Sequence, residues 1–446
     1  MDYITLLRGI NVRNFTKFGG SSVADVIQLN KMKNIIMSDE SRRYVVVSAP
    51  GKRYAGDNKI TDLLYLCKTH LEHNLPYEQI FQVVCDRYMA EAVNLGVKAD
   101  LAAEFADIRK KLENGGTADY IASRGEYVNA MIIAEFLGFD FVDAADMIVF
   151  DKNGVLMPEE TSKRIVEILA EHEKAVIPGF YGADSDGNII TFSRGGSDIT
   201  GSLVAKAVKA DVYENWTDVS GLLIADPRII PDAKPIKTIS YLELRELSYM
   251  GAEVLHEDSI FPVRELNIPI NIRNTNEPDD EGTMIMDWEG EPERIITGIA
   301  GNKDFTVIAI YKNMLSSEKG FMRRLFGIFD DSNIAIEHTP SGIDTVSVVV
   351  SNSDLAGKLG KLVADIERTI RPDKIDVFED MALIATVGRG MNRRLGVSAK
   401  IFSALAAAEV NVRMIDQGST EMNIIVGVEN PDFEKAIKAI YNAFEG

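Results

Sequence analysis

The residues best suited to chemistry lie in a glycine-rich segment at positions 192–198. Its sequence, FSRGGSD, places Arg194 and Asp198 on either side of a Gly-Gly pair and runs directly into a stretch with helical apolar spacing. Backbone N–H groups in such a turn point at anionic oxygens. Arg194 can bind a carboxylate through two parallel hydrogen bonds. Asp198 can cap the helix or orient a substrate ammonium, and the sequence leaves both roles open.

A second glycine turn, KFGGSSV at positions 17–23, stands near the N-terminus. Lys17 lies just before the turn, where an ammonium reaches a transferred phosphoryl group, and Ser21 and Ser22 can cap a helix or donate hydroxyls. Taken alone, such a motif is as often a strand-to-helix turn with a surface lysine. Two Gly-Gly turns, each beside a basic residue, favour a polyanionic ligand held from two sides. The pattern GxxxxGK(S/T) does not occur, which excludes the P-loop enzymes.

Three further segments hold candidate ligands that also have ordinary structural roles. Glu126, in SRGE, is expected in the first turn of an apolar helix, where an acidic residue stabilises the helix dipole. Thr61, in KITDLL, is expected to be a helix N-cap. The segment 216–228, WTDVSGLLIADPR, has the form of a strand end, a loop and an Asp-Pro turn, and such loops bind ligands in open α/β sheets. Trp216 alternatively fills the core, and we interpret His256 as structural.

Composition narrows the classes of function. The 446 residues predict two or three domains. A net charge of −20 argues against nucleic-acid binding, which depends on phosphate neutralisation, and requires any phosphate site to supply cations, amides or Mg²⁺ locally. Cys67 and Cys85 are the two cysteines, so the sequence predicts neither a disulfide framework nor a metal-ligand cluster. With no long apolar run and a poor signal peptide, we expect a cytoplasmic protein without a membrane span.

Residues 15 to about 290 alternate short β-branched strands with longer helical patterns. This alternation predicts an α/β fold with a mainly parallel sheet covered on both faces. An acidic segment that contains Gly and Pro, 274–301, predicts a linker or domain boundary. Strands are expected at 44–49, 139–143, 175–180, 212–216 and 269–273, and helices at 122–137, 161–172, 199–209 and 241–256.

Beyond this linker the chain repeats a β-α-β-β-α pattern. The pattern predicts two small sandwiches that share or pair edges, and unpaired edges favour a dimer through them. The first copy is expected to have strands at 305–311, 334–339 and 345–351 and helices at 320–332 and 355–370, followed by a short strand at 375–378. The second is expected to have strands at 382–387, 410–416 and 421–428 and helices at 394–408 and 433–444.

Together these segments resemble the aspartokinases of the amino-acid kinase superfamily, over all but the first fourteen residues. The resemblance is carried by KFGGSSV, VVVSAPG, KITDLL, SRGEYVNA, PGFYG, FSRGGSDITGSLVAKAV, WTDVSGLLIADPR and MGAEVLH, in that order. MLSSEKGFMRRLFGIF and VRMIDQGSTEMNIIV are similar to the paired ACT regulatory domains of that family. The resemblance implies an amino-acid-kinase sandwich with a mainly parallel sheet plus two ferredoxin-like ACT domains. The implied parts are an extension at 1–14, a catalytic domain at 15–300 and ACT domains at 301–379 and 380–446.

The resemblance implies ATP-dependent phosphorylation of the aspartate β-carboxylate, which yields 4-phospho-L-aspartate and ADP and leads to lysine, methionine and threonine. Mg²⁺ would be carried by ATP, with no metal ligands of the chain's own. Lys17 would stabilise the transferred phosphoryl group. Arg194 would take the α-carboxylate of aspartate, and Glu126 and Asp198 would lie near its ammonium. By motif position, the residues that would hold aspartate are Ser48, Thr61, Glu126, Arg194 and Asp198. The phosphate path would be lined by Gly19, Gly20 and Ser22. The nucleotide would be contacted by Thr217, Asp218 and Arg228.

Two features depart from the family pattern. Glu253 stands in GAEVLH, where many members have a lysine that helps to bind nucleotide. A longer insertion at 51–58 separates VVVSAP from KITDLL, and we expect it to form a mobile flap. The chain stops at Gly446 without a dinucleotide fingerprint, so a monofunctional enzyme is expected rather than a fusion with homoserine dehydrogenase.

The ACT segments imply feedback by an end-product amino acid at a dimer interface, with a tetramer as the alternative assembly. The acidic Glu337 and Asp344 favour lysine over threonine as the effector, although both can be ordinary solvated carboxylates. The implied effector residues are Met314, Ser317, Gly320, Phe321, Met322, Glu337, Asp344 and Thr345.

Two alternatives stay open at this point. A sister kinase could act on glutamate derivatives, carbamate or a nucleoside monophosphate, but the ACT pair and KFGGSSV argue against it. A non-catalytic amino-acid sensor could retain the kinase shell, but the intact Lys17, Arg194 and Asp198 argue against that.

Overall fold

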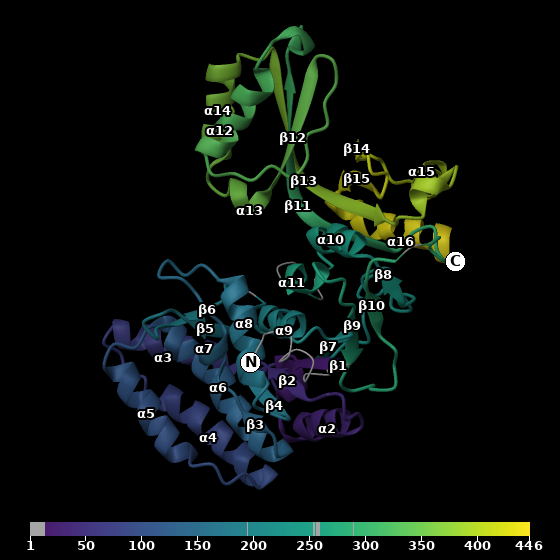
Figure 1. Ribbon diagram of the computed structural model, residues 1–446. Helices are drawn as coiled ribbons and strands as arrows, with labels where there is room; N and C mark the ends of the chain where they lie inside the picture. The colour runs from purple at the N-terminus through teal and green to yellow at the C-terminus, as the bar shows by residue number, and fades with distance from the viewer. Residues whose placement is uncertain (1–13, 194, 253–254, 256–258, 289) are drawn as a thin grey trace. The chain divides into compact units, whose positions relative to one another are not determined.

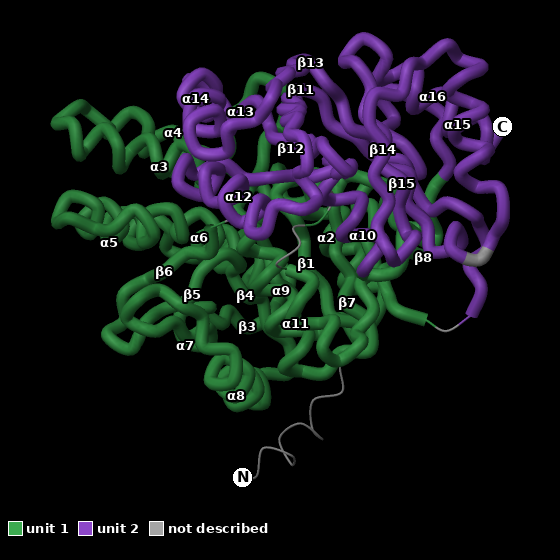
Figure 2. Tube along the Cα trace, turned by 90° about the horizontal axis from the view of Figure 1, so that it is seen from above, with its two compact units in different colours: residues 1–222, 235–241, 254–288 green, residues 223–234, 242–253, 289–446 purple. Residues whose placement is uncertain are grey.

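The computed structural model describes residues 14–193, 195–252, 255, 259–288 and 290–446. The predictions for Arg194, Glu253 and His256 lie outside the described residues. The chain divides into two compact units, which Figure 2 shows in different colours. Unit 1 comprises Met1–Leu222, Pro235–Tyr241 and Val254–Trp288, and unit 2 comprises Leu223–Lys234, Leu242–Glu253 and Glu289–Gly446.

Unit 1 is built on a mainly parallel sheet, which confirms the predicted fold class (Figure 1). Its strand order is β3-β4-β2-β1-β7-β9-β10-β8; β9 and β10 pair antiparallel and the other neighbours pair in parallel. The central strands are largely buried, as expected for a sheet covered on both faces. The strands are β1 (Asn14–Phe18), β2 (Tyr44–Val47), β3 (Asp140–Phe141), β4 (Ala175–Pro178), β7 (Val212–Thr217), β8 (Thr238–Ile239), β9 (Ile270–Asn274) and β10 (Thr283–Ile285), with a separate hairpin of β5 (Tyr181–Ala183) and β6 (Ile189–Thr191).

Helices cover both faces of this sheet. On one face, helices α2 and α6 share an apolar core with Phe18, Val45 and Val176 of the strands. On the other, Lys17 reaches helix α9, because side chains alternate between the two faces along a strand. The helical elements of unit 1 are η1 (Gly20–Val23), α2 (Val26–Met37), α3 (Ile60–Glu72), α4 (Glu78–Leu95), α5 (Leu101–Glu113), α6 (Ala118–Leu137), α7 (Ala144–Met147), α8 (Pro158–Leu169), α9 (Gly196–Ala207) and α11 (Phe261–Arg264).

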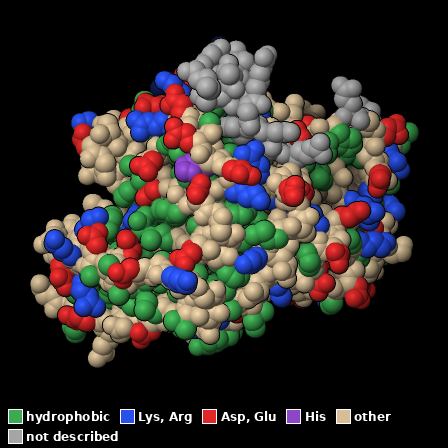
Figure 3. Space-filling view, turned by 60° about the horizontal axis from the view of Figure 1, so that its bottom comes forward, with side chains coloured by type: hydrophobic (Ala, Val, Ile, Leu, Met, Phe, Trp, Pro, Cys, Tyr) green, Lys and Arg blue, Asp and Glu red, His purple; other side chains and the backbone are tan. Residues whose placement is uncertain are grey.

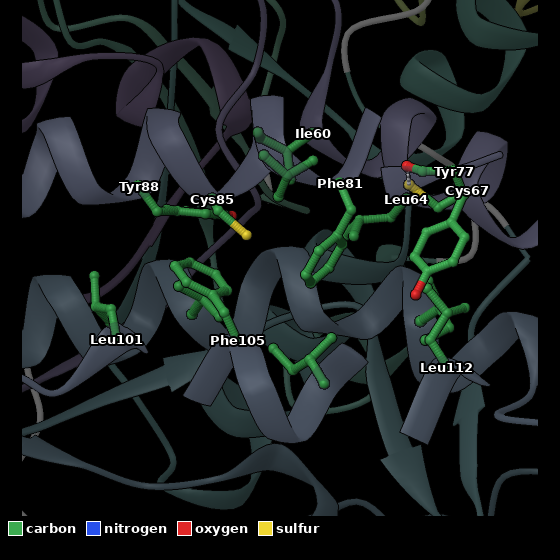
Figure 4. Packing of buried hydrophobic residues seen from close by; sticks show 14 of the residues in the cluster. Ile60, Leu64, Cys67, Tyr77, Phe81, Cys85, Tyr88, Leu101, Phe105 and Leu112 are labelled. Carbon is green, nitrogen blue, oxygen red and sulfur yellow. Dashed lines mark hydrogen bonds between the residues drawn. The ribbon is translucent and has the colours of Figure 1, made fainter. Parts of the chain in front are cut away.

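Helices α3 to α6 pack around an apolar cluster of their own, shown in Figure 4. The rings of Tyr88 and Phe105 lie 6.2 Å apart, and the Tyr88 hydroxyl donates a hydrogen bond of 2.6 Å to the carbonyl oxygen of Gly125. Cys67 and Cys85 are free and buried here. Burial raises the pKa of the Cys67 thiol to about 12 and that of Cys85 to about 11. Both therefore stay protonated at neutral pH and pack as small apolar side chains.

Unit 2 contains one antiparallel sheet with the order β12-β11-β13-β15-β14. Strands β11 and β13 are long and pair antiparallel over most of their length, so each runs through both halves of the sheet. The start of β11 pairs with the end of β13, and the end of β11 pairs with the start of β13. The two sandwiches predicted from the repeat thus share a single sheet. The elements are α10 (Tyr241–Tyr249), which begins in a unit 1 segment, β11 (Gly298–Tyr311), η3 (Leu315–Ser317), α12 (Phe321–Asp331), β12 (Thr345–Ser351), α13 (Asn352–Leu355), α14 (Leu359–Ile370), β13 (Lys374–Val387), η4 (Met391–Arg393), α15 (Val397–Ala407), β14 (Met414–Asp416), β15 (Asn423–Glu429), η5 (Asn430–Asp432) and α16 (Phe433–Glu445).

Two predictions for regular structure were wrong. The strand expected at 334–339 does not form; His338 makes an isolated bridge with Val349, and Pro340, which has no N–H, follows two residues later. The helix expected at 241–256 ends at Tyr249, and Gly251 has a φ of +96°, outside the helical region.

Basic and acidic side chains are interspersed on the face of the molecule that Figure 3 shows. In the sequence as a whole, acidic residues outnumber basic ones. Within the described part of the chain, no helix is both long and apolar enough to cross a membrane.

Candidate active site

Polar side chains gather where the parallel strands of unit 1 end. Strands β2, β1 and β7 are neighbours, and their carboxyl ends are followed by Ser48, by the turn at 19–22, and by Asp218, one residue after Thr217 ends β7. The amide of Ser48 donates to the carbonyl oxygen of Phe18 at 3.1 Å, which ties the first two of these ends together. Ligands bind at this edge in open α/β sheets. The topology therefore places most of the predicted substrate and nucleotide residues along one edge.

Lys17 and Asp198 form a buried ion pair at this edge. The Lys17 ammonium lies 2.5 Å from Oδ1 of Asp198, and the two side chains are 7% and 19% exposed. Lys17 is paired across the sheet with Asn215, so both side chains emerge on the face that α9 covers. Asn215 donates from Nδ2 to the same Oδ1 of Asp198 at 2.7 Å. The cluster holds one cation and one carboxylate in fixed positions beside the glycine turn.

Asp198 does not cap its helix, so one of the two roles left open by the sequence is excluded. The N-cap of α9 is Gly195, with a φ of +58°, and Asp198 is the third residue of the helix. No side chain caps this end of α9 among the described residues. The Asp198 carboxylate is instead directed to Lys17 and Asn215. An acidic residue in the first turn also interacts favourably with the helix dipole.

The first glycine turn is held against β7. The amide of Gly19 donates to the carbonyl oxygen of Trp216 at 2.9 Å, and the Ser22 hydroxyl donates to the same oxygen at 3.3 Å. The hydroxyl of Thr275, after β9, donates to Ser22 Oγ at 2.7 Å. The turn that follows β1 is thus fixed by the ends of β7 and β9, and Ser22 is a buried part of that framework rather than a helix cap.

Glu126 is a buried carboxyl group facing the segment that follows β2. It lies within α6, which begins at Ala118 and is capped by the Thr117 side chain, so the prediction of a first-turn position was wrong. Gly125 lets the helix approach closely, since a Cβ there would lie 2.9 Å from Cβ of Ala49. Glu126 is 5% exposed, and its Oε2 has no hydrogen-bond partner among the described residues.

Burial raises the pKa of Glu126 to about 8, partly opposed by the amide of Ala49 and the charge of Arg124. A buried carboxyl group with one oxygen that lacks a partner is suited to receive a cationic group of a ligand, which would restore its ionised form.

The raised pKa of Glu126 predicts a pH dependence of stability. The folded protein keeps this proton up to about pH 8, whereas the unfolded carboxyl loses it near its ordinary value of 4.5. The contribution of Glu126 to stability is therefore complete below that value and is lost as the pH rises through about 8. We expect the free energy of unfolding of the ligand-free wild type to fall relative to Glu126→Gln between about pH 5 and about pH 8. Urea denaturation of both proteins measures this difference, and a difference independent of pH would contradict it.

Other predicted site residues have less distinctive surroundings. Thr61 is the second residue of α3, whose N-cap is Lys59, so the prediction that it caps this helix was wrong. The Thr217 hydroxyl donates to Asp218 at 3.2 Å at the end of β7. Arg228 belongs to unit 2, where its exposed guanidinium pairs with Asp226.

The predicted effector residues lie in unit 2, around the start of α12. The amide of Met314 donates to Asp344 Oδ1 at 2.9 Å, and the amide of Ser316 donates to the carbonyl oxygen of Ile343 at 3.1 Å. These bonds join the segment that holds Ser317 and Gly320 to the turn before Thr345, and Phe321 and Met322 follow as the first two residues of α12. Glu337 instead accepts a hydrogen bond from the Tyr249 hydroxyl.

Sequence reasoning missed two residues of the unit 1 site, Asn215 and Thr275. Asn215 is 3% exposed and follows Glu214 in the strand VYENWT. Two polar residues inside a central strand need hydrogen-bond partners, and that signal could have drawn attention to Asn215. Thr275 lies in the segment interpreted as a linker, where no comparable signal exists.

Comparisons with known proteins distinguish between the alternatives that the sequence left open. The model of the amino acid kinase family matches residues 13–274, and an ACT domain model matches residues 384–444. Aspartokinase 3 of Bacillus subtilis is 36% identical over 445 residues, which cover 96% of this chain and 98% of that protein. The chain belongs to the aspartokinases. The predicted family, and with it the predicted enzyme, an aspartate kinase, is confirmed.

Solved aspartokinase structures agree with this assignment. Aspartate kinase of Clostridium acetobutylicum is 51% identical, with a TM-score of 0.91 over 98% of this chain and 100% of that one. Aspartokinase III of Escherichia coli, in complex with aspartate and ADP, is 25% identical, with a TM-score of 0.75 over 97% and 99% of the two chains. A further relative, lysine-sensitive aspartokinase 3 of E. coli, is 27% identical over 464 residues, covering 96% of this chain and 99% of its own length.

Proposed function

We propose that this aspartokinase transfers the γ-phosphoryl group of ATP to the β-carboxylate of L-aspartate, giving 4-phospho-L-aspartate and ADP. The observation that carries the proposal is the Lys17–Asp198–Asn215 cluster, which lies at the carboxyl edge of the sheet beside the glycine turn. The E. coli aspartokinase in complex with aspartate and ADP supports this choice of substrate and nucleotide.

The arrangement of the site supports a division of roles. Glu126 and Asp198 bind the ammonium of aspartate, with Ser48 and Thr61 beside them and Arg194 on the α-carboxylate. The amides of Gly19 and Gly20, with Ser22, line the phosphate path, and Thr217, Asp218 and Arg228 contact the nucleotide. Glu126 suits its role because its carboxyl group is buried and Oε2 lacks a partner among the described residues.

The reaction then requires mainly positioning and charge neutralisation. A carboxylate nucleophile carries no proton that must be removed, so no general base is needed. Phosphoryl transfer in other enzymes is accelerated by in-line alignment and by cations that stabilise the charge on the transferred group. Lys17 supplies such a cation, and Asp198, whose Oδ1 also accepts a hydrogen bond from Asn215, holds its ammonium in place.

Mg²⁺ is expected to enter with the nucleotide. In the described ranges, no group of three or more His, Cys, Asp or Glu side chains is arranged to hold a metal ion. Phosphate oxygens are the usual ligands of Mg²⁺ in kinases. The ion would neutralise phosphate charge, while the chain's own residues orient the two substrates.

Release of ADP with Mg·ATP and L-aspartate tests the proposal. We expect ADP release to depend on L-aspartate and to saturate with it. Equal ADP release with L-glutamate in its place, or none with either acid, would reject aspartate as the substrate.

We propose lysine as the feedback effector, with threonine as the second candidate. The name of the lysine-sensitive E. coli relative supports lysine, as does the acidic Asp344 at the loop that holds Met314. Lysine is expected to inhibit ADP release and to raise the melting temperature, because a ligand that binds the folded state stabilises it. Asp344→Asn should weaken both effects and leave activity without lysine unchanged. If millimolar lysine alters neither quantity while threonine does, threonine is the effector.

The remaining assignments belong to the same proposal. We infer a cytoplasmic enzyme of lysine, methionine and threonine synthesis that assembles as a homo-oligomer through its ACT domains. We keep the domain boundaries at 15–300, 301–379 and 380–446, preceded by the extension at 1–14. Size measurement in solution, with and without lysine, tests the assembly.

A further inference from the structure

The segment between β2 and α3 packs directly against the glycine turn that we assign to the phosphate path. The amide of Gly51 donates to the carbonyl oxygen of Gly20 at 2.8 Å. A Cβ on Gly51 would lie 2.8 Å from the carbonyl carbon of Gly20, and a Cβ on Gly20 would lie 2.9 Å from the carbonyl oxygen of Ala49. Because these two backbones touch without an intervening side chain, the position of one fixes the position of the other.

A buried arginine on α4 holds both backbones. Arg87 is 6% exposed, and its Nη2 donates to the carbonyl oxygens of Gly51 at 2.6 Å and Ala24 at 2.8 Å. Ala24 is the residue that ends the helical turn η1. Nη1 donates to the carbonyl oxygen of Asn58 at 3.2 Å. One guanidinium group therefore binds the end of the glycine turn and both ends of the insertion predicted to be a flap.

The acidic neighbours of Arg87 do not explain this position. Its Nη1 lies 3.6 Å from Asp57 Oδ2, and its Nε lies 3.5 Å from Glu91 Oε1, without a hydrogen bond between Nε and that oxygen. Asp57 is bound more closely by Arg53, at 2.7 Å. The short, directional contacts of Arg87 are those to backbone carbonyls, which suit a planar group with several donors.

We propose that Arg87 is a positioning residue that holds the glycine turn and the facing segment in the conformation that receives the phosphates of ATP. The inference rests on the proposed phosphate path at Gly19, Gly20 and Ser22. Arg87 itself acts through the backbones at Ala24 and Gly51. Lysine cannot replace Arg87. The two terminal nitrogens of the guanidinium group donate to three separate carbonyl oxygens, and the single nitrogen of an ammonium group cannot reach all three.

The test compares two variants, Arg87→Ala and Arg87→Lys. Arg87→Ala removes all contacts of the side chain. Arg87→Lys keeps the charge and serves as the milder variant where Arg87→Ala does not fold. Both are expected to raise KM for ATP by roughly tenfold or more, the scale of losing a charge-assisted hydrogen bond. KM for aspartate should rise by a smaller factor than KM for ATP, since Arg87 binds the carbonyl oxygens of Ala24, Gly51 and Asn58 and none of the proposed aspartate ligands directly. Amide hydrogen exchange should become faster at residues 19–24 and 49–58.

Two control variants separate this role from general stabilisation. Phe105→Leu disturbs the cluster of α3 to α6 and should lower the melting temperature without changing KM for ATP. Glu91→Gln removes the ion pair with Arg87 and should leave KM for ATP within about twofold of the wild type. The proposal is overturned if Arg87→Lys leaves KM for ATP unchanged, or if either control reproduces its effect.

Exchange measurements on the wild type with ADP distinguish this inference from the proposed function. ADP should slow exchange at residues 19–24. If it does not, the phosphate path itself is wrong. If it does, and Arg87→Lys changes neither exchange there nor KM for ATP, the path stands and the role of Arg87 is rejected.

Discussion

Lys17→Ala is expected to lower kcat by at least ~10²-fold, the usual cost of removing one preorganised charge donor from a transition state. The ammonium of Lys17 is 2.5 Å from Asp198 and is held in a nearly closed environment, so it needs little reorganisation during the reaction. KM for aspartate should change by a much smaller factor than kcat, because Lys17 serves the transferred group and reaches the proposed aspartate ligands only through Asp198. Steady-state kinetics with saturating ATP measures both quantities.

A lysine on the helix that carries Asp198 provides the control. Lys206, in the last turn of α9, forms an ion pair with Glu265. Lys206→Ala therefore removes a lysine and its ion pair from the same helix without changing the Lys17–Asp198–Asn215 cluster. Its kcat should stay close to that of the wild type. A near-normal kcat in Lys17→Ala would remove Lys17 from the reaction, and an equal loss in both variants would point to damage of α9.

Glu126→Gln is expected to raise KM for aspartate by roughly 30-fold or more, because a buried charge pair that loses one partner costs at least ~2 kcal/mol. In the free enzyme, burial raises the pKa of Glu126 to about 8, so the group is mostly neutral at pH 7 and glutamine closely resembles it. At that pH the carboxyl group of the unfolded wild type is ionised, so Glu126→Gln should have a higher free energy of unfolding than the wild type while its aspartate binding weakens. Neither kcat nor KM for ATP should change by a comparable factor.

The same pKa gives this prediction a pH dependence with a definite sign. Pairing with the aspartate ammonium requires the carboxylate, so the proton of Glu126 must leave when aspartate binds below about pH 8. KM for aspartate in the wild type should fall as the pH rises toward that value, whereas KM in Glu126→Gln should be flat. Glu135→Gln, further along α6, serves as the control, since Glu135 binds the amides of Lys98 and Ala99. Parallel pH profiles for Glu126→Gln and the wild type would contradict the assignment.

Local sequence signals predicted the frame of the site well. The alternation of β-branched strands and helical stretches predicted the mainly parallel sheet, and the glycine turns after β1 and before α9 lie where their motifs placed them. Helix starts were less predictable. Glu126 was placed in a first turn because the apolar pattern begins near SRGE, but Thr117 caps α6 earlier through the amide of Tyr120.

Contacts between distant parts of the chain could not be predicted from one sequence. Asn215 reaches Asp198 because β1 and β7 are neighbours and share a register, and Arg87 reaches Gly51 because α4 folds back on the segment after β2. The start of β11 was interpreted as linker from its acidic composition with Gly and Pro, and its partner, the end of β13, lies roughly eighty to ninety residues later, beyond the reach of a local pattern. In each case the topology, rather than the local pattern, determines the partner.

The most direct test of the central claim is to trap the product as it forms. An acyl phosphate reacts with hydroxylamine, whereas a phosphate ester or free phosphate does not. With Mg·ATP, L-aspartate and hydroxylamine, the wild type should form aspartate β-hydroxamate in equal amount to ADP, and Lys17→Ala should form it at least ~10²-fold more slowly. ADP release without hydroxamate, or hydroxamate formed at the wild-type rate by Lys17→Ala, would contradict phosphoryl transfer to the β-carboxylate at this site.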